Sequence, residues 1–167
     1  SPGICKLGAI GGDTNKAYTS GNVGILSKSG GMSSETAYVL KLAGIGQSTV
    51  VGIGGDVING FSFVDGLKLF AKDSETKAVV MFGEIGGTYE EEAAAYIKQT
   101  HYKKPVVAFI SGKFADALPN VTLGHAGAII EAGKGTRASK VSALQEAGVH
   151  VVEVHHEIVD VVKKLLG

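Results

Sequence analysis

Apolar segments alternate with segments of mixed polarity along most of the chain. Five short runs rich in Val and Ile have the length of β-strands: residues 23–27, 49–53, 78–82, 105–110 and 149–154. Because these runs are nearly continuous rather than alternating, they indicate strands that are buried on both faces. Apolar residues recur at helical spacing after each run, which predicts helices over about residues 32–43, 63–71, 89–99, 138–147 and 158–166.

Strand and helix alternate about every thirty residues, as in right-handed βαβ units of a parallel sheet. We therefore predict an α/β domain of three layers, with helices on both faces of a flavodoxin-like, doubly wound sheet. The expected order of the five parallel strands is 2-1-3-4-5. Periodicity does not determine which strands are neighbours, so a different strand order is the main alternative.

The start of the chain does not share this pattern. Pro2 and several glycines interrupt it, so residues 1–20 are predicted to be an irregular lead-in or linker, and residues 21–167 the folded domain. The sequence begins at Ser1 without an initiator methionine. We expect it to be a fragment of a larger polypeptide.

Composition narrows the class of partner and compartment. The 16 Lys and Arg residues balance 16 Asp and Glu residues without forming a basic stripe, so no nucleic-acid partner is expected. The apolar runs are too short to span a bilayer and no signal pattern is found, so no membrane partner is expected either. Cys5 is the only cysteine, which rules out an internal disulfide and favours a reducing, cytoplasmic location.

Glycine marks one edge of the predicted sheet. Four loops that follow strands are rich in Gly and hydroxyl residues: 29–33, 54–60, 84–88 and 111–135. Ligands of doubly wound sheets bind beyond the carboxyl ends of the strands, where the strand order reverses. We therefore predict a ligand site at this edge, with the loop after the first strand close to the loop after the third.

The first of these loops contains Ser29, Gly30 and Gly31 ahead of a helix. Free amide groups, the helix dipole and the absence of Cβ atoms favour phosphate binding there. The alternative is structural, with Ser29 as the helix N-cap and the glycines forming a tight turn. The segment is neither a Walker A loop nor a Gly-x-Gly-x-x-Gly motif.

Glu84 directly follows the apolar third strand. In the functional interpretation its carboxylate accepts a hydrogen bond from one ring nitrogen of a histidine, so that the other nitrogen presents a lone pair. In the structural interpretation it caps the helix that begins near Thr88. The neighbouring acidic run 90–92 is predicted to be the solvated, dipole-favoured first turn of that helix.

His125 is the candidate nucleophile. It lies in Gly124-His125-Ala126-Gly127, where small residues let a bulky anion approach, and Gly124 and Gly127 are predicted to help bind phosphate. An ordinary loop histidine, hydrogen-bonded to a nearby carbonyl, is the alternative.

The remaining reactive residues give weaker signals. The other four histidines are expected to lie away from the glycine-rich loops, and they lack metal-ligand spacing, so no metal site is predicted. Asp56 either contacts a ligand or caps a turn, and Cys5 is expected to be inert. The four histidines are His101, His150, His155 and His156.

These motifs together resemble the C-terminal domain of the succinyl-CoA synthetase α subunit, a module shared with ATP-citrate lyase and ADP-forming acyl-CoA synthetases. The most specific match is Gly124-His125-Ala126-Gly127-Ala128, and the similarity extends in order over nearly the whole chain. The segment 29–33 looks somewhat more like the version of this module in citrate lyase.

The resemblance implies a ligase that forms an acyl-CoA from a carboxylic acid, with NDP and phosphate as the other products. His125 matches the histidine that is transiently phosphorylated, and Glu84 matches the glutamate that orients it. Ser29 and Gly30 match the phosphate-stabilising site. This implies an enzyme fragment that does not complete turnover alone.

The resemblance also implies the partners. We expect a β subunit with an ATP-grasp domain and an upstream CoA-binding domain, with CoA, ATP or GTP, and Mg²⁺ in the full complex. No cofactor is expected to be held by this domain alone. A non-catalytic, flavodoxin-like interaction module is the competing hypothesis, and flavin binding ranks lower because no aromatic pair flanks the glycine-rich loops.

Overall fold

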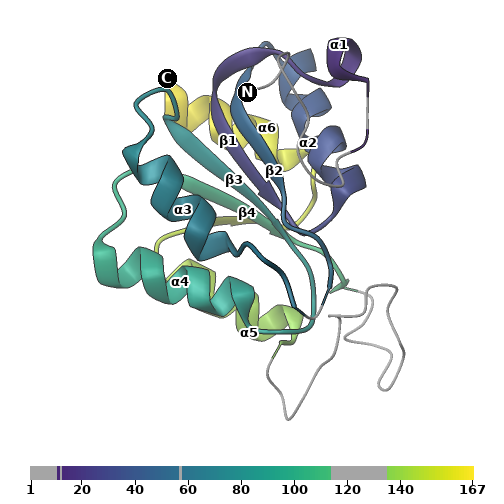
Figure 1. Ribbon diagram of the computed structural model, residues 1–167. Helices are drawn as coiled ribbons and strands as arrows, with labels where there is room; N and C mark the ends of the chain where they lie inside the picture. The colour runs from purple at the N-terminus through teal and green to yellow at the C-terminus, as the bar shows by residue number, and fades with distance from the viewer. Residues whose placement is uncertain (1–10, 12, 57, 114–134) are drawn as a thin grey trace.

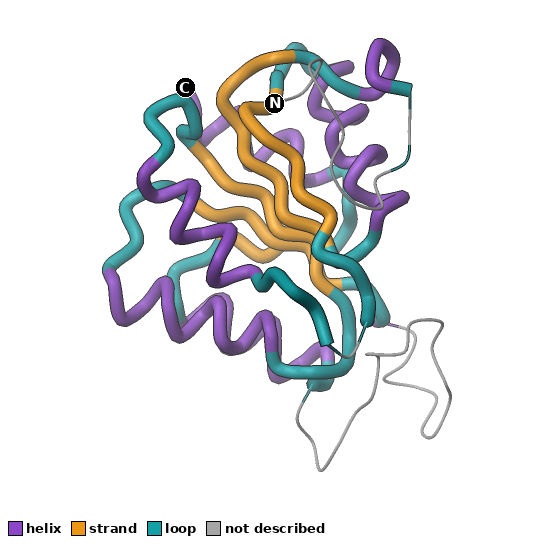
Figure 2. Tube along the Cα trace, viewed as in Figure 1, coloured by secondary structure: helices purple, strands orange, loops and turns teal. Residues whose placement is uncertain are grey.

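A computed structural model describes residues 11, 13–56, 58–113 and 135–167. Within them, five parallel strands form one sheet in the order β2-β1-β3-β4-β5, which confirms the predicted flavodoxin-like topology (Figures 1 and 2). The strands are β1 (Ser20–Ser27), β2 (Gln47–Gly52), β3 (Ala78–Gly83), β4 (Val106–Ile110) and β5 (His150–Val152). The helices are α1 (Thr14–Ala17), α2 (Gly30–Leu42), α3 (Phe63–Lys72), α4 (Tyr89–Thr100), α5 (Arg137–Glu146) and α6 (Glu157–Leu166).

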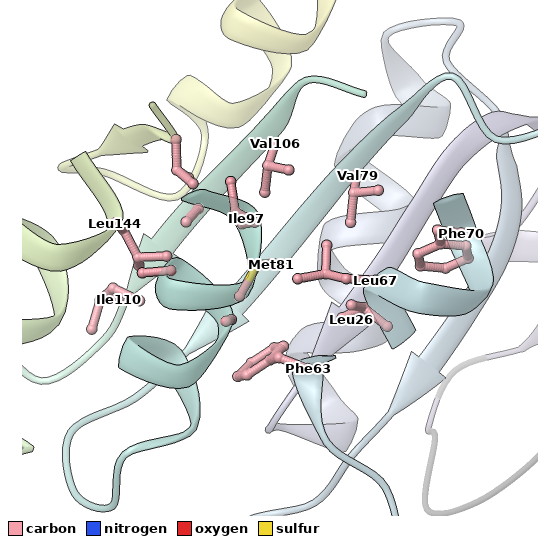
Figure 3. Packing of buried hydrophobic residues seen from close by; sticks show 14 residues of the cluster. Leu26, Phe63, Leu67, Phe70, Val79, Met81, Ile97, Val106, Ile110 and Leu144 are labelled. Carbon is pink, nitrogen blue, oxygen red and sulfur yellow. The ribbon is translucent and has the colours of Figure 1, made fainter. Parts of the chain in front are cut away.

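Two apolar cores lie on opposite faces of the sheet, because successive side chains of a strand point to opposite sides. On β3, Val79 and Met81 belong to the core that α3, α4 and α5 cover, whereas Val80 belongs to the core beneath α1, α2 and α6. Figure 3 shows the first core, where Leu67 of α3 and Ile97 of α4 pack over the strands. The three layers follow directly from continuously apolar strands.

Helix α3 packs closely on β1 at Gly66. A Cβ atom built on Gly66 would come within 2.4 Å of the Leu26 side chain on β1, so any larger residue would force Leu26 or the helix to move. The helix begins with a capping box, in which Ser62 Oγ accepts a hydrogen bond from the Asp65 amide and the Asp65 carboxylate accepts one from the Ser62 amide.

Several predicted boundaries were wrong by a few residues. Helix α2 begins at Gly30 rather than Met32, because Ser29 already provides the N-cap. The last strand, β5, ends at Val152, two residues before the predicted end at residue 154. A single helical turn, α1, lies within residues 1–20, which were predicted to be irregular. Among the described helices, none combines the length and the apolar character that crossing a membrane requires.

Candidate functional site

The turn from β1 into α2 holds Ser29 at the N-cap position. Its Oγ accepts a hydrogen bond from the Met32 amide (3.3 Å), and its carbonyl accepts one from the Ser33 hydroxyl (2.8 Å). The structural interpretation of Ser29 is therefore confirmed, and it is compatible with the functional one. A helix leaves its first amide groups without intrahelical partners, and here they belong to Gly30 and Gly31.

Gly31 is exposed, and a Cβ atom there would meet no atom within 4 Å. Packing within the described chain therefore does not require glycine at this position. A glycine in this first turn leaves room for close approach to its backbone.

Glu84 lies where β3 ends, one strand away from Ser29. Strands β1 and β3 are neighbours, with Ser27 opposite Phe82, so the prediction that their carboxyl-end loops lie side by side is confirmed. Glu84 is 8 % exposed, and its Oε1 forms an ion pair with Lys28 Nζ at 3.5 Å. Thr88 occupies the N-cap position of α4, so Glu84 is not the capping residue.

Lys28 is a site residue that the sequence analysis missed. Its side chain is buried, and its ammonium lies 4.9 Å from the centroid of the Tyr89 ring. A lysine between a strand and a glycine-rich turn usually extends into solvent, so nothing in the hydrophobic pattern distinguished it.

The prediction that the acidic first turn of α4 is solvated was wrong for Glu90. Glu90 is fully buried, forms an ion pair with Lys140 of α5, and accepts a hydrogen bond from the Glu84 amide at 3.1 Å. Burial raises the pKa of Glu90, and the charge of Lys140 opposes that shift. Helix α5 packs beside α4 (Figure 1) and brings Lys140 there, which local sequence does not reveal. Glu92 is exposed, as predicted.

The residues on either side of segment 114–134 contact the loop of Glu84. The amide and the hydroxyl of Ser111 both donate to the Gly83 carbonyl, at 3.0 and 3.2 Å. The Gly86 amide donates to the Gly135 carbonyl at 2.7 Å. Gly135 has a φ of 77° and is packed against Gly87, so glycine is needed there.

His125, Gly124 and Gly127 lie outside the described residues, so their predicted roles stay predictions. The described residues that flank their segment, Ser111 and Gly135, nevertheless lie at the loop of Glu84. Ser29 and Glu84 lie at the same edge of the sheet.

Comparison with known proteins assigns the chain to a family. A family model described as CoA-ligase matches residues 26–151, which is most of the chain. The chain belongs to the CoA-ligase family.

The curated relatives of this CoA-ligase chain include α subunits of ADP-forming succinate–CoA ligase. The subunit of Methanothermobacter thermautotrophicus is 52 % identical over 100 % of the chain, and subunit α 1 of Archaeoglobus fulgidus is 50 % identical over 99 %. The chain spans 55 % of each of these relatives, so it corresponds to about half of their length.

A solved structure shares the fold of this CoA-ligase chain. ATP citrate lyase of Methanosaeta concilii, in complex with (3S)-citryl-CoA, matches 90 % of the chain with a TM-score of 0.83 and 32 % identity. The chain covers 25 % of that protein.

Two other residues at the carboxyl edge of this CoA-ligase fold differ in their surroundings. Asp56 is exposed and its carbonyl accepts a hydrogen bond from the Asn59 side chain at 3.0 Å, which gives it a role in a turn. His155 packs against the helix α2 itself, where its Nε2 lies 2.9 Å from Thr36 Oγ1. Burial lowers the pKa of His155.

Proposed function

We propose that this chain is the phosphate-relay domain of an acid–CoA ligase of the succinyl-CoA synthetase type. His125 is the nucleophile, Glu84 orients its ring, and the amide end of α2 at Ser29, Gly30 and Gly31 stabilises the transferred phosphate, with Gly124 and Gly127 alongside. The observation that carries the proposal is the convergence at one sheet edge of a helix N-terminus, the buried Glu84 and both described flanks of segment 114–134.

The proposed reaction has three displacements. A ring nitrogen of His125 attacks the terminal phosphorus of the nucleotide, so that an N–P bond forms and the NDP leaves. A carboxylate oxygen of the acid then attacks this phosphorus, which releases the histidine and gives an acyl phosphate. The CoA sulfur finally displaces phosphate from the acyl carbon. Glu84 supports the first step because its carboxylate accepts a hydrogen bond from the N–H of one ring nitrogen, so that the other ring nitrogen presents its lone pair to phosphorus.

The other components are proposed to come from outside this chain. A β subunit with an ATP-grasp domain supplies ATP or GTP, and an upstream CoA-binding domain supplies CoA. Mg²⁺ would shield the nucleotide phosphates. In the described residues, no group of three or more His, Cys, Asp and Glu side chains is arranged to hold a metal ion, so we assign Mg²⁺ no ligand from this part.

Phosphorylation of His125 tests the proposal. With ATP and the β subunit of a close relative, the chain should acquire one phosphoryl group that is labile in acid and stable in base. His125→Ala should abolish the label without unfolding the protein, whereas His150→Ala, which removes an exposed histidine on β5, should not. Full turnover by a complex containing His125→Ala would instead favour the non-catalytic interaction module.

Citrate is the second candidate acid. The turn 29–33 resembles the citrate-lyase version of the module, and ATP citrate lyase shares the fold at 32 % identity. The higher identity of the succinate–CoA ligase subunits, 50 % and 52 %, favours succinate. Phosphorylated chain in the complete complex should therefore lose its label on addition of succinate with CoA. Faster loss with citrate and CoA would reverse the assignment.

A further inference from the structure

Lys28 places a positive charge inside the carboxyl edge of the sheet. Its side chain is 1 % exposed, and its amide donates to the Phe82 carbonyl at 3.0 Å, which fixes the residue against β3. Taking an ammonium group out of water is costly unless an opposite charge lies close by. The contacts of Lys28 therefore indicate which carboxylate it serves.

Two pairs of oppositely charged side chains are buried at this edge. Lys140 is in direct contact with Glu90, and it also lies 3.3 Å from the partly exposed Glu91. Lys28 lies 3.5 Å from Glu84. The direct contact of Glu90 is therefore with Lys140, and that of Glu84 is with Lys28, although the charge of Lys28 also acts on Glu90.

Tyr89 gives the Lys28 ammonium a second support. The centroid of its ring lies 4.9 Å from Lys28 Nζ, within the range in which the ring face attracts a cation. Tyr89 is the first residue of α4, so this contact fixes the ammonium relative to the helix that follows the Glu84 loop. An ammonium supported in this way is preorganised rather than mobile.

We propose that Lys28 is a positioning residue whose ion pair orients the buried Glu84 carboxylate, so that it accepts a hydrogen bond from the phosphate-accepting histidine. The inference rests on the proposed function, because it takes the role of Glu84 from there. A carboxylate that is turned away from the ring would no longer hold the histidine in the tautomer that attacks phosphorus. In this role Lys28 acts through Glu84.

A double-mutant cycle separates this role from a general effect on folding. Phosphoramidate serves as the phosphoryl donor, because it tests the chain without a partner, and acid-labile phosphorylation of His125 is followed by mass spectrometry. Lys28→Met should slow the reaction about tenfold, a coupling typical of side chains in contact. In the Glu84→Gln background the same substitution should change the rate less than about twofold, because no carboxylate is left to support.

Two further variants sharpen the test. Lys28→Arg keeps the positive charge and should retain most of the phosphorylation rate. If only the packing of the aliphatic part of Lys28 mattered, Lys28→Met would retain more of the rate than Lys28→Arg. Lys77→Met removes an exposed lysine just before β3, at the opposite edge of the sheet, and should react like the unchanged chain. Lys28→Met removes the cation that contacts Glu84 and could destabilise the fold, so circular dichroism is used to check that this variant is folded. Lys28→Met/Glu84→Gln removes both charges and keeps the cycle measurable.

The outcomes distinguish this inference from the proposed function. If His125 is phosphorylated but Lys28→Met reacts at the original rate, or slows equally in both backgrounds, the role of Lys28 is wrong while the phosphate relay stands. If His125 takes up phosphate neither from phosphoramidate nor from ATP with the β subunit, both proposals fall. A tenfold loss that disappears in the Glu84→Gln background supports the role of Lys28.

Discussion

Replacing Lys140 by Met should destabilise the fold, and the penalty should depend on pH. Lys140 and Glu90 are both fully buried and in direct contact between α5 and α4. Removing one partner of such a pair leaves the other charge in a medium that cannot solvate it, which typically costs about 3–5 kcal/mol. For a domain of this size, that loss corresponds to a decrease of about 10 °C in Tm.

The sign of the pH dependence follows from Glu90. Burial raises the pKa of Glu90 above its ordinary value of 4.5, and Lys140 opposes the shift. A carboxyl group with a raised pKa in the folded state contributes stability that is present below its ordinary pKa and is lost as the pH rises through the folded pKa. Without Lys140, more stability is lost as the pH rises, because the charge of Lys140 then no longer opposes the effect of burial on Glu90. The deficit of Lys140→Met should therefore be greatest near pH 8 and become small near pH 4.

Urea unfolding at several pH values between 4 and 8 measures this deficit. Lys98→Met removes an exposed lysine of α4 and should cost less than about 0.5 kcal/mol at every pH. The double variant Lys140→Met/Glu90→Gln removes both charges and should recover much of the stability at pH 8. A deficit for Lys140→Met that is the same at pH 4 and pH 8 would show that lost packing, and not an unpaired charge, is responsible.

Three smaller predictions concern local contacts. Gly66→Ala should lower the free energy of unfolding, measured in urea, by about 1–2 kcal/mol, because its Cβ would come within 2.4 Å of Leu26. Gly31→Ala has open space around the new Cβ and should be neutral or stabilising in the same assay. Ser29→Ala should lose about 1 kcal/mol with the N-cap hydrogen bond, seen as a lower Tm; an unchanged Tm would contradict the cap. Since burial lowers the pKa of His155, protonation favours the unfolded chain, so stability should fall as the pH decreases below about 6.5. His155→Gln should lessen that slope in thermal unfolding, and an unaltered slope would contradict the assignment.

The sheet could be predicted from the sequence because its signal is repeated. Five nearly continuous apolar runs specify buried parallel strands, and the 2-1-3-4-5 order follows once the fold class is recognised. Glu84 could be found because a carboxylate directly after a buried strand breaks this apolar pattern. The resemblance to a known family added the roles of the residues, which periodicity does not contain.

The buried charges on helices could not be predicted in the same way. Glu90 lies in a run of three glutamates that fits a solvated first turn, and Lys140 lies in a helix with polar residues around it. Their burial depends on α4 and α5 packing side by side, a contact between residues 50 positions apart. Only the folded arrangement decides which of several equivalent charges on a helix is enclosed.

The distribution of these buried charges is itself evidence for a site. In the described part of the chain, every buried charged side chain lies toward the carboxyl edge of the sheet. These side chains are Lys28, Glu84, Glu90, Arg137 and Lys140. At the opposite edge the buried polar groups are neutral and hydrogen-bonded, as with Ser48 and Thr76. Apolar residues of similar volume often give equal or greater stability than a buried ion pair, so stability alone does not account for this asymmetry. A preorganised charge environment at the edge where phosphate is proposed to be transferred accounts for it.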